Sequence, residues 1–211
     1  MECVVESVRG IAAELHDRDL PSPVVPSLWW FELTRPALIL GSTQSDSVVD
    51  HESCRQGGVD VVRRHSGGGA VLLVPGDVTW FDIIIPRSHP QWDDDVSRAA
   101  WWVGEAVERA LGDETLTVHR GPMISSAWSA TVCFAGLGPG EVTRGGAKVL
   151  GLSQRRTRDL IRYQCALYRR WDPVLLAGLL APGGPSAADL EDVVGVAELD
   201  LDALVRSLGK Q

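Results

Sequence analysis

Segments typical of β-strands dominate residues 27–86, and this order of elements constrains the fold more than any other feature of the sequence. The apolar stretches have strand length, and each ends at a glycine, a proline or a polar turn. A doubly wound parallel sheet would require strands and helices to alternate regularly, which they do not. The expected strands lie at residues 27–41, as two strands around a turn at 34–36, at 59–64, and at 70–74 and 78–86, as a hairpin closed by residues 75–77.

Helical spacing first appears after Asp95, a residue that can cap a helix over 96–111. Trp101 and Trp102 lie toward the edge of the apolar face of this helix, where packing under a loop is favoured over a partner contact. This order indicates a single α+β domain over residues 1–211, with helices on a mixed or antiparallel sheet. Further strands are expected at 116–119, 130–134, 147–153 and 160–167, and further helices at 173–180, 187–194 and 201–208.

The overall charge of the chain limits its partners. The formal net charge is −8, and both nucleic acid and anionic membrane require a positive docking face, so neither is expected to bind. A secretion signal is not expected, and no apolar stretch approaches the roughly 20 residues needed to cross a bilayer. The four cysteines are scattered without a CxxC pair, which favours reduced thiols in the cytoplasm and no metal site.

The segment RRHSGGGAV, residues 63–71, is the first candidate binding site. Three consecutive glycines after a strand allow successive amide groups to face one concavity, which suits an anion. Strand geometry sends Arg63 and Arg64 to opposite faces, so one of them is free to bind a carboxylate or phosphate, and Ser66 adds a hydroxyl. A run of three glycines is about as often a plain flexible turn. The spacing fits neither a Walker A loop nor a dinucleotide-binding loop.

Lys148 and Cys133 are the second and third candidates. A lone lysine is usually solvated, but Lys148 begins an apolar strand flanked by Gly146 and Gly151, where a ligand can approach the backbone closely. Lys148 is therefore a candidate charge clamp. Cys133 lies at the expected end of a strand, where a buried structural cysteine is the commoner case. A functional role for Cys133 is expected only if Lys148 lies beside it.

Taken in order, these segments resemble a known family. The glycine segment, followed by PGDVTWFDIIIP at 75–86, resembles the signature of the lipoate-protein ligase A family within the biotin and lipoate A/B protein ligase superfamily. LILGSTQ at 38–44 resembles the strand and turn that precede the signature, and residues 133–157 resemble the later lysine-bearing block. The resemblance implies an α+β fold of the class II synthetase and biotin ligase type. It also implies transfer of a lipoyl or octanoyl group to a lysine of a carrier domain.

The resemblance also implies roles for individual residues. Arg64 would contact the acyl carboxylate or the phosphate of an acyl adenylate, and Lys148 would stabilise the negative charge that develops during acyl transfer. Cys133 stands fifteen residues before Lys148, as the nucleophilic cysteine does in the octanoyltransferase branch. The chain departs from the family pattern where Leu72 replaces a common histidine and Asp77 replaces an asparagine. The candidate catalytic residues are thus Lys148 and Cys133, and the candidate substrate- or nucleotide-binding residues are Arg63, Arg64, Ser66, Gly67, Gly68, Gly69, Ala70, Val71, Leu72 and Asp77.

Three functions remain open at this level. The first is a lipoate-protein ligase that uses ATP and Mg²⁺ to activate lipoate or octanoate. The second is a cysteine-dependent octanoyltransferase that takes the acyl group from acyl carrier protein, and the third is a non-catalytic protein that binds an acyl ligand or a carrier. The expected partner is a lipoyl carrier domain or a glycine cleavage H-type protein, docked on the basic segment 144–170. An accessory C-terminal domain is not expected within the 211 residues.

Overall fold

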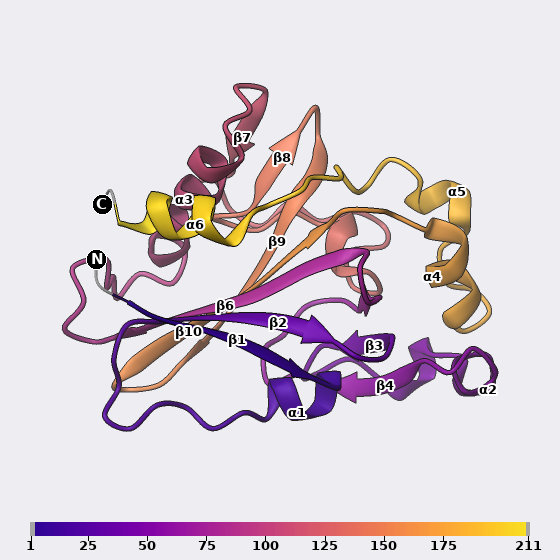
Figure 1. Ribbon diagram of the computed structural model, residues 1–211. Helices are drawn as coiled ribbons and strands as arrows, with labels where there is room; N and C mark the ends of the chain where they lie inside the picture. Colours follow the sequence, from indigo (N-terminus) through magenta and orange to yellow (C-terminus); the bar gives the residue numbers. More distant parts are fainter. Residues whose placement is uncertain (1–2, 210–211) are drawn as a thin grey trace.

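The computed structural model of the protein describes residues 3–209, which form two packed β-sheets with helices around them (Figure 1). The larger sheet has seven strands in the order β1-β2-β6-β10-β9-β8-β7, and the smaller has the order β4-β3-β5. Neighbouring strands are antiparallel in both sheets, except that β1 runs parallel to β2 in the larger sheet and β3 runs parallel to β4 in the smaller one. Both sheets are therefore mixed. The strands are β1 (Val4–Gly10), β2 (Ser27–Leu33), β3 (Ala37–Leu40), β4 (Asp60–Arg63), β5 (Val71–Leu73), β6 (Val78–Pro86), β7 (Leu116–Val118), β8 (Val142–Arg144), β9 (Ala147–Arg156) and β10 (Leu160–Tyr168).

Helices cover both faces of the larger sheet and one end of the smaller one. In Figure 1, α3 and α6 lie on one side of the larger sheet, while α1 and the smaller sheet lie on the other. Across residues 3–209, no helix is long and apolar enough to cross a membrane. The helices are α1 (Ala12–His16), α2 (His51–Gln56), α3 (Trp101–Leu111), α4 (Pro173–Leu179), α5 (Ala187–Leu190) and α6 (Leu201–Leu208), with 3₁₀ turns η1 (Asp46–Val48), η2 (Arg98–Ala100) and η3 (Cys133–Ala135).

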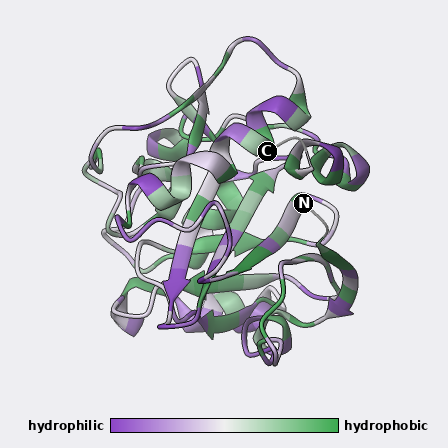
Figure 2. Ribbon diagram, turned by 90° about the vertical axis from the view of Figure 1, so that its left-hand side faces the viewer, coloured by the Kyte–Doolittle hydropathy of each residue, from purple (hydrophilic) through white to green (hydrophobic). Residues whose placement is uncertain are grey.

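Strand β6 shows why the two faces differ. It pairs with β2 on one edge and β10 on the other, and seven of its nine residues are buried. Because side chains alternate along a strand, Phe81 and Ile83 pack against α3 and α6, whereas Trp80 and Ile84 pack against α1 and the smaller sheet. Figure 2 shows the resulting concentration of hydrophobic residues in the central strands. The predicted α+β class, with helices flanking a mixed sheet, is confirmed.

The predicted hairpin of residues 70–74 and 78–86 is wrong. β5 pairs with β3 in the smaller sheet, whereas β6 pairs with β2 and β10 in the larger one. The turn between them crosses from sheet to sheet and is fixed by the end of β10. The backbone carbonyl of Asp77 accepts from the backbone N–H of Arg169 at 2.7 Å, and its carboxylate pairs with Arg170 at 2.6 Å. The turn residues correctly predicted a turn at 75–77. Pairing with distant strands decided that the two strands it joins lie in different sheets.

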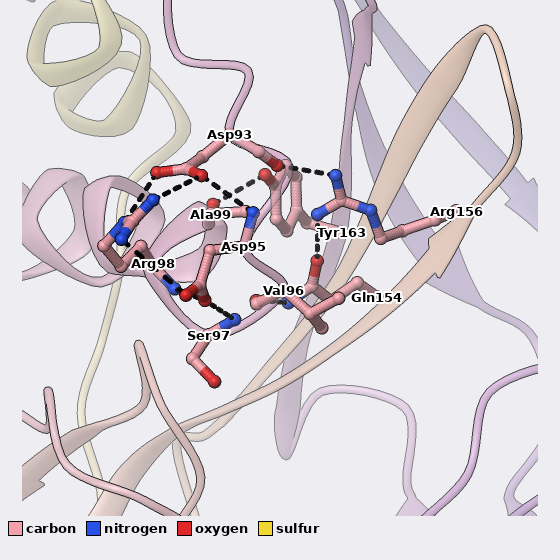
Figure 3. Close-up of polar contacts among 9 residues, drawn as sticks. All are labelled: Asp93, Asp95, Val96, Ser97, Arg98, Ala99, Gln154, Arg156 and Tyr163. Carbon is pink, nitrogen blue, oxygen red and sulfur yellow. Dashed lines mark hydrogen bonds and ion pairs between the residues drawn. The ribbon is translucent and has the colours of Figure 1, made fainter.

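The segment before α3 also differs from its prediction. The Asp95 carboxylate does accept from the backbone N–H groups of Ser97 and Arg98, but the helix over 96–111 begins with η2 and continues as α3. The larger sheet fixes this segment, as Figure 3 shows: the Tyr163 hydroxyl donates to the Ala99 carbonyl at 2.6 Å. Arg156 and Gln154 of β9 donate to the carbonyls of Asp93 and Val96.

Other segments were wrongly predicted or missed. The strand predicted at 130–134 is instead η3, joined to the smaller sheet by one parallel bridge between Ala70 and Val132. The helix predicted at 187–194 is the shorter α5. Trp102 is buried in the core against Tyr163, with ring centroids 5.6 Å apart, whereas Trp101 is only partly buried, as expected for at least one of the two. No sequence pattern predicted β1, α1, α2 or β8.

Candidate active site

A cavity between the two sheets is lined by three of the sequence-predicted residues, Arg64, Val71 and Cys133. It contains about 430 Å³ of empty space, counting its open mouth. Strands β3 and β5 form one wall, β6, β9 and β10 the other, and η3 and α1 complete the lining. The apolar lining suits a hydrocarbon chain and includes Ile39, Val71, Leu73, Trp80, Phe134 and Leu152.

The glycine loop lies against η3 because its residues have no side chains. A Cβ atom on Gly69 would lie 2.6 Å from the backbone carbon of Val132, and one on Gly41 would lie 2.0 Å from the carbonyl oxygen of Gly68. Gly68 also has φ of 99°, a conformation that favours glycine. Ala70 then exchanges backbone hydrogen bonds with the η3 segment: its carbonyl accepts from the N–H of Cys133 at 2.9 Å. The loop therefore places the Cys133 backbone at the cavity.

Arg64 is buried at the cavity and Arg63 is not, as their alternation along the strand predicts. The Arg64 guanidinium donates to the carbonyls of Gly67 at 2.7 Å and Gly69 at 3.0 Å, which fixes the loop. Its Nε is buried without a hydrogen-bond partner among residues 3–209. Arg63 instead donates to the carbonyl of Gly41 at 2.8 Å and pairs with Asp46 on the outer surface.

The other predicted binding residues divide in the same way. Ser66 lies behind the cavity wall, with its hydroxyl 3.0 Å from that of Ser153, which lines the cavity. Val71 lines the cavity, whereas Leu72, its neighbour in the strand, packs into the core formed with α4. Asp77 fixes the turn between the two sheets through Arg170. The structure thus brings Val71 to the cavity lining and Ser66 into contact with it, and places Leu72 and Asp77 away from it.

Lys148 is buried and forms an ion pair that the sequence analysis missed. Its Nζ lies 2.9 Å from the Glu141 carboxylate and donates to the backbone carbonyl of Cys133 at 2.7 Å. The side chains of Lys148 and Glu141 are only 3% and 4% exposed. Glu141 also accepts from the backbone N–H of Gly138 at 2.6 Å and of Leu152 at 3.0 Å. These contacts fix the ammonium group beside η3.

Cys133 begins η3 and lines the cavity. Its sulfur lies beside the glycine loop, 4.0 Å from the position that a Cβ on Gly68 would take. Lys148 faces a second hollow of about 750 Å³, counting open solvent, and Phe134 lines both spaces. The Lys148 Nζ lies 5.2 Å from the centre of the Phe134 ring. A thiol and a fixed ammonium group therefore flank the same short 3₁₀ turn.

A buried polar network on β6 and β10 adjoins the cavity, which its members His16 and Gln164 line. Ser66 is the only member that was predicted. The Asp82 carboxylate pairs with Arg162 at 2.5 Å, and complete burial raises the pKa of Asp82 to about 6 although Arg162 acts to lower it. Gln164 accepts from the Ser66 hydroxyl at 3.3 Å, and its amide nitrogen lies 3.1 Å from Nδ1 of His16. Burial, and then the charges of Arg162 and Arg64, lower the pKa of His16 to about 3.

The basic segment 144–170 does not form a single exposed surface. Lys148 and Arg162 are buried in ion pairs, Arg144 pairs with Asp113, and Arg170 pairs with Asp77. Four of the eight basic residues of this segment are thus in ion pairs.

The fold and the cavity together define a class: an α+β domain that encloses an apolar site for a small molecule beside a thiol and a buried lysine. The sequence model of the lipoyl protein ligase A/B catalytic domain matches residues 13–197, so the chain belongs to that family. The predicted family is thereby confirmed, and with it an enzyme of the lipoate-protein ligase or transferase type.

The curated relatives are octanoyltransferases. Octanoyltransferase LipM of Clostridioides difficile strain 630 is 26% identical over 201 residues, which cover 88% of this chain and 73% of the relative. Octanoyltransferase LipM of Carboxydothermus hydrogenoformans is 28% identical over 148 residues, which cover 70% of this chain and 54% of the relative. That of Kyrpidia tusciae is 28% identical over 164 residues, covering 74% of this chain and 59% of the relative. The matches to the latter two span little more than half of their length.

The similar solved structures are lipoate-protein ligases. The putative lipoate protein ligase Ta0514 from T. acidophilum with bound lipoic acid has a TM-score of 0.67 at 18% identity, covering all of this chain and 84% of that one. A bi-partite lipoate protein ligase from Thermoplasma acidophilum has a TM-score of 0.72 at 16% identity, covering all of this chain and 82% of that one. At these identities the likeness establishes the fold alone, and it agrees with the predicted class.

Proposed function

We propose that the protein is a cysteine-dependent acyltransferase that moves an octanoyl or lipoyl group onto a lysine of a carrier domain. One observation carries the proposal: Cys133 lines the apolar cavity while its own carbonyl accepts from the buried Lys148 at 2.7 Å. A hydrocarbon chain in the cavity has its activated end near this thiol. The naming of the relatives as octanoyltransferases supports the same chemistry.

The reaction proceeds in two steps, acylation of Cys133 and then transfer of the acyl group to the acceptor lysine. The Cys133 sulfur attacks the carbonyl carbon of a donor thioester, a new carbon–sulfur bond forms, and the donor thiol leaves with the proton that Cys133 loses. The amine of the acceptor lysine then attacks the acyl-enzyme, the amide bond forms, and Cys133 regains its proton. Each step passes through an oxyanion, and Lys148 supplies a fixed positive charge beside η3 that stabilises it.

Intact-mass spectrometry tests this proposal. Octanoyl carried on acyl carrier protein is expected to add one octanoyl mass to the enzyme, and a carrier domain added afterwards is expected to remove it. Cys133→Ser should abolish the adduct. Cys3→Ser is the matched control because Cys3 is also half-buried but packs at the far edge of the core. Full turnover by Cys133→Ser would overturn the proposal, and binding without turnover by the native protein would identify a non-catalytic acyl-binding protein.

The second candidate is an ATP-dependent ligase, which the unpartnered Nε of Arg64 favours. A buried guanidinium at the cavity wall suits the free carboxylate of lipoate or octanoate, or the phosphate of its adenylate. In that reaction ATP with Mg²⁺ supplies the activation and Cys133 is dispensable. Pyrophosphate exchange into ATP that depends on lipoate and survives in Cys133→Ser would establish the ligase. Its absence, together with the Cys133 adduct, would leave the transferase.

The acceptor in either case is a lysine of a lipoyl carrier domain or a glycine cleavage H-type protein, with acyl carrier protein as the donor for the transferase. We propose that residues 1–211 act as one catalytic domain. Four of the eight basic residues of the segment 144–170 are in ion pairs, and the other four can still contribute positive charge to docking of an acidic carrier.

A further inference from the structure

His16 presents a buried polar atom that nothing in the proposed reaction uses. The residue ends α1, is 5% exposed and lines the same cavity as Cys133. Its Nε2 has no hydrogen-bond partner among residues 3–209. Buried polar groups are nearly always paired, so an unpaired one in the wall of a ligand cavity points to a partner that arrives with the ligand.

The neighbouring groups determine whether this atom donates or accepts. Gln164 places its oxygen toward the Ser66 hydroxyl and its amide nitrogen toward the acceptor-only carboxylate of Asp82. The same nitrogen lies 3.1 Å from Nδ1 of His16, so Gln164 donates and Nδ1 accepts. A neutral imidazole that accepts at Nδ1 carries its hydrogen on Nε2. The pKa of His16, lowered to about 3, keeps the ring neutral at physiological pH.

The position of His16 along the cavity follows from the register of β9 and β10. Gly151, which lies against the Phe134 ring, pairs with Ala166. Gln164, which contacts His16, is two residues earlier on the same face of β10. Two strand residues span about 7 Å, which is less than the length of an extended eight-carbon chain. Because Cys133 and His16 line the same cavity, an acyl group attached at Cys133 is long enough for the distal half of its chain to reach His16.

We propose that His16 is a specificity-determining residue whose Nε2–H donates a hydrogen bond to an acceptor atom in the distal half of the acyl chain. The inference rests on the proposed function. It assigns to this chain an acyl group that carries sulfur or oxygen there, such as the dithiolane of a lipoyl group or a ketone, in preference to a plain octanoyl chain. An octanoyl chain leaves the donor unpaired, whereas an acceptor at the matching carbon pairs it.

Internal competition tests the proposal in one reaction. The full chain is incubated with equal concentrations of the pantetheine thioesters of octanoate, lipoate and 6-oxo-octanoate, and intact mass resolves the three Cys133 adducts. The lipoyl and oxo adducts are expected to form about tenfold faster than the octanoyl adduct. Hydroxylamine releases thioesters but not disulfides, which separates acylation from reaction of the dithiolane with a thiol. The ketone and the dithiolane report separately on oxygen and sulfur acceptors.

Substitution at His16 provides the decisive comparison. His16→Phe keeps an aromatic ring against Trp80, whose centroid lies 4.7 Å away, but lacks the donor. It is expected to form all three adducts at equal rates. His51→Phe is the matched control, because His51 is an exposed histidine at the start of α2 and does not line the cavity. This control should keep the native preference.

A second measurement uses the native protein. The ¹⁵N spectrum of the imidazole is expected to show the Nε2–H tautomer, with a resonance that moves when the lipoyl or oxo adduct forms and stays when the octanoyl adduct forms. Equal adduct rates in the native protein, or an Nδ1–H tautomer, would overturn the specificity role while leaving the transferase intact. If no thioester yields an adduct, the transferase fails and the inference fails with it.

Discussion

The two faces of the larger sheet use the same strands for different purposes. On the face toward α3 and α6, β10 presents Ile161, Tyr163 and Leu167 to an apolar core. On the opposite face, the same strand presents Arg162 and Gln164, which join a buried polar network at the cavity. Apolar contacts tolerate small shifts, whereas paired polar groups lose their partners when they move. The face toward α3 and α6 mainly stabilises the fold, and the opposite face holds the polar groups beside the cavity in fixed positions.

Disruption of the buried ion pair between Lys148 and Glu141 is expected to give the largest effect on stability. Glu141→Leu leaves Lys148 buried without a counter-charge, which should lower the free energy of unfolding by about 3–5 kcal/mol. The double variant Glu141→Leu with Lys148→Met removes both charges and should recover most of this loss. Urea denaturation measures both values. A loss below about 1 kcal/mol in the single variant would mean that Lys148 finds water instead.

A pair of substitutions on the two faces separates stability from function. Ile83→Ala opens a cavity in the core and should cost about 2–5 kcal/mol, with unchanged activity per folded molecule. Gln164→Leu should cost less but should change which acyl groups the enzyme prefers, because it frees Nδ1 of His16. Denaturation and competition assays together measure the contrast. Equal activity profiles in the two variants would contradict the division between faces.

The glycine loop offers a matched test of positioning. Gly69→Ala places a methyl group 2.6 Å from the Val132 backbone, so η3 must shift, whereas Gly67→Ala meets nothing within 4 Å. A displacement of about 1 Å at a reacting group can cost roughly 10²-fold in rate. We therefore expect a large loss of adduct formation in Gly69→Ala and little change in Gly67→Ala. Comparable rates for the two variants would show that the loop does not position Cys133.

The smallest effect is a pH dependence of stability. Because the folded-state pKa of His16 is lowered from 6.5 to about 3, the unfolded chain binds the proton more readily between these values. The stability that the neutral ring contributes is present above pH 6.5 and is lost as the pH falls below it. Native protein should therefore lose about 1 kcal/mol more than His16→Phe between pH 6.5 and 5.5, measured by denaturation. Parallel stability curves would show that His16 protonates freely when folded.

Sequence patterns predicted the site elements that depend on local geometry. The alternation of a strand separated Arg64 from Arg63, and the three glycines marked a close approach that only residues without side chains permit. The glycines around Lys148 marked it as a candidate site residue, and the structure shows that it is buried. Cys133, whose carbonyl accepts a hydrogen bond from Lys148, was also a candidate. The same patterns could not identify Glu141, because the β8 strand that follows it is three residues long and has no periodicity to detect.

The sequence by itself determined the α+β class, the family and the candidate residues of the glycine loop and η3. Tertiary structure alone decided which strands pair across residues 74–77, and it brought His16 to Gln164 across 148 positions and Asp82 to Arg162 across 80. Local propensity and spacing act over a few residues, and they carry no information on contacts between distant segments. Those contacts form within the larger sheet and between it and α1 when this face is buried, and they supply the polar groups beside the cavity.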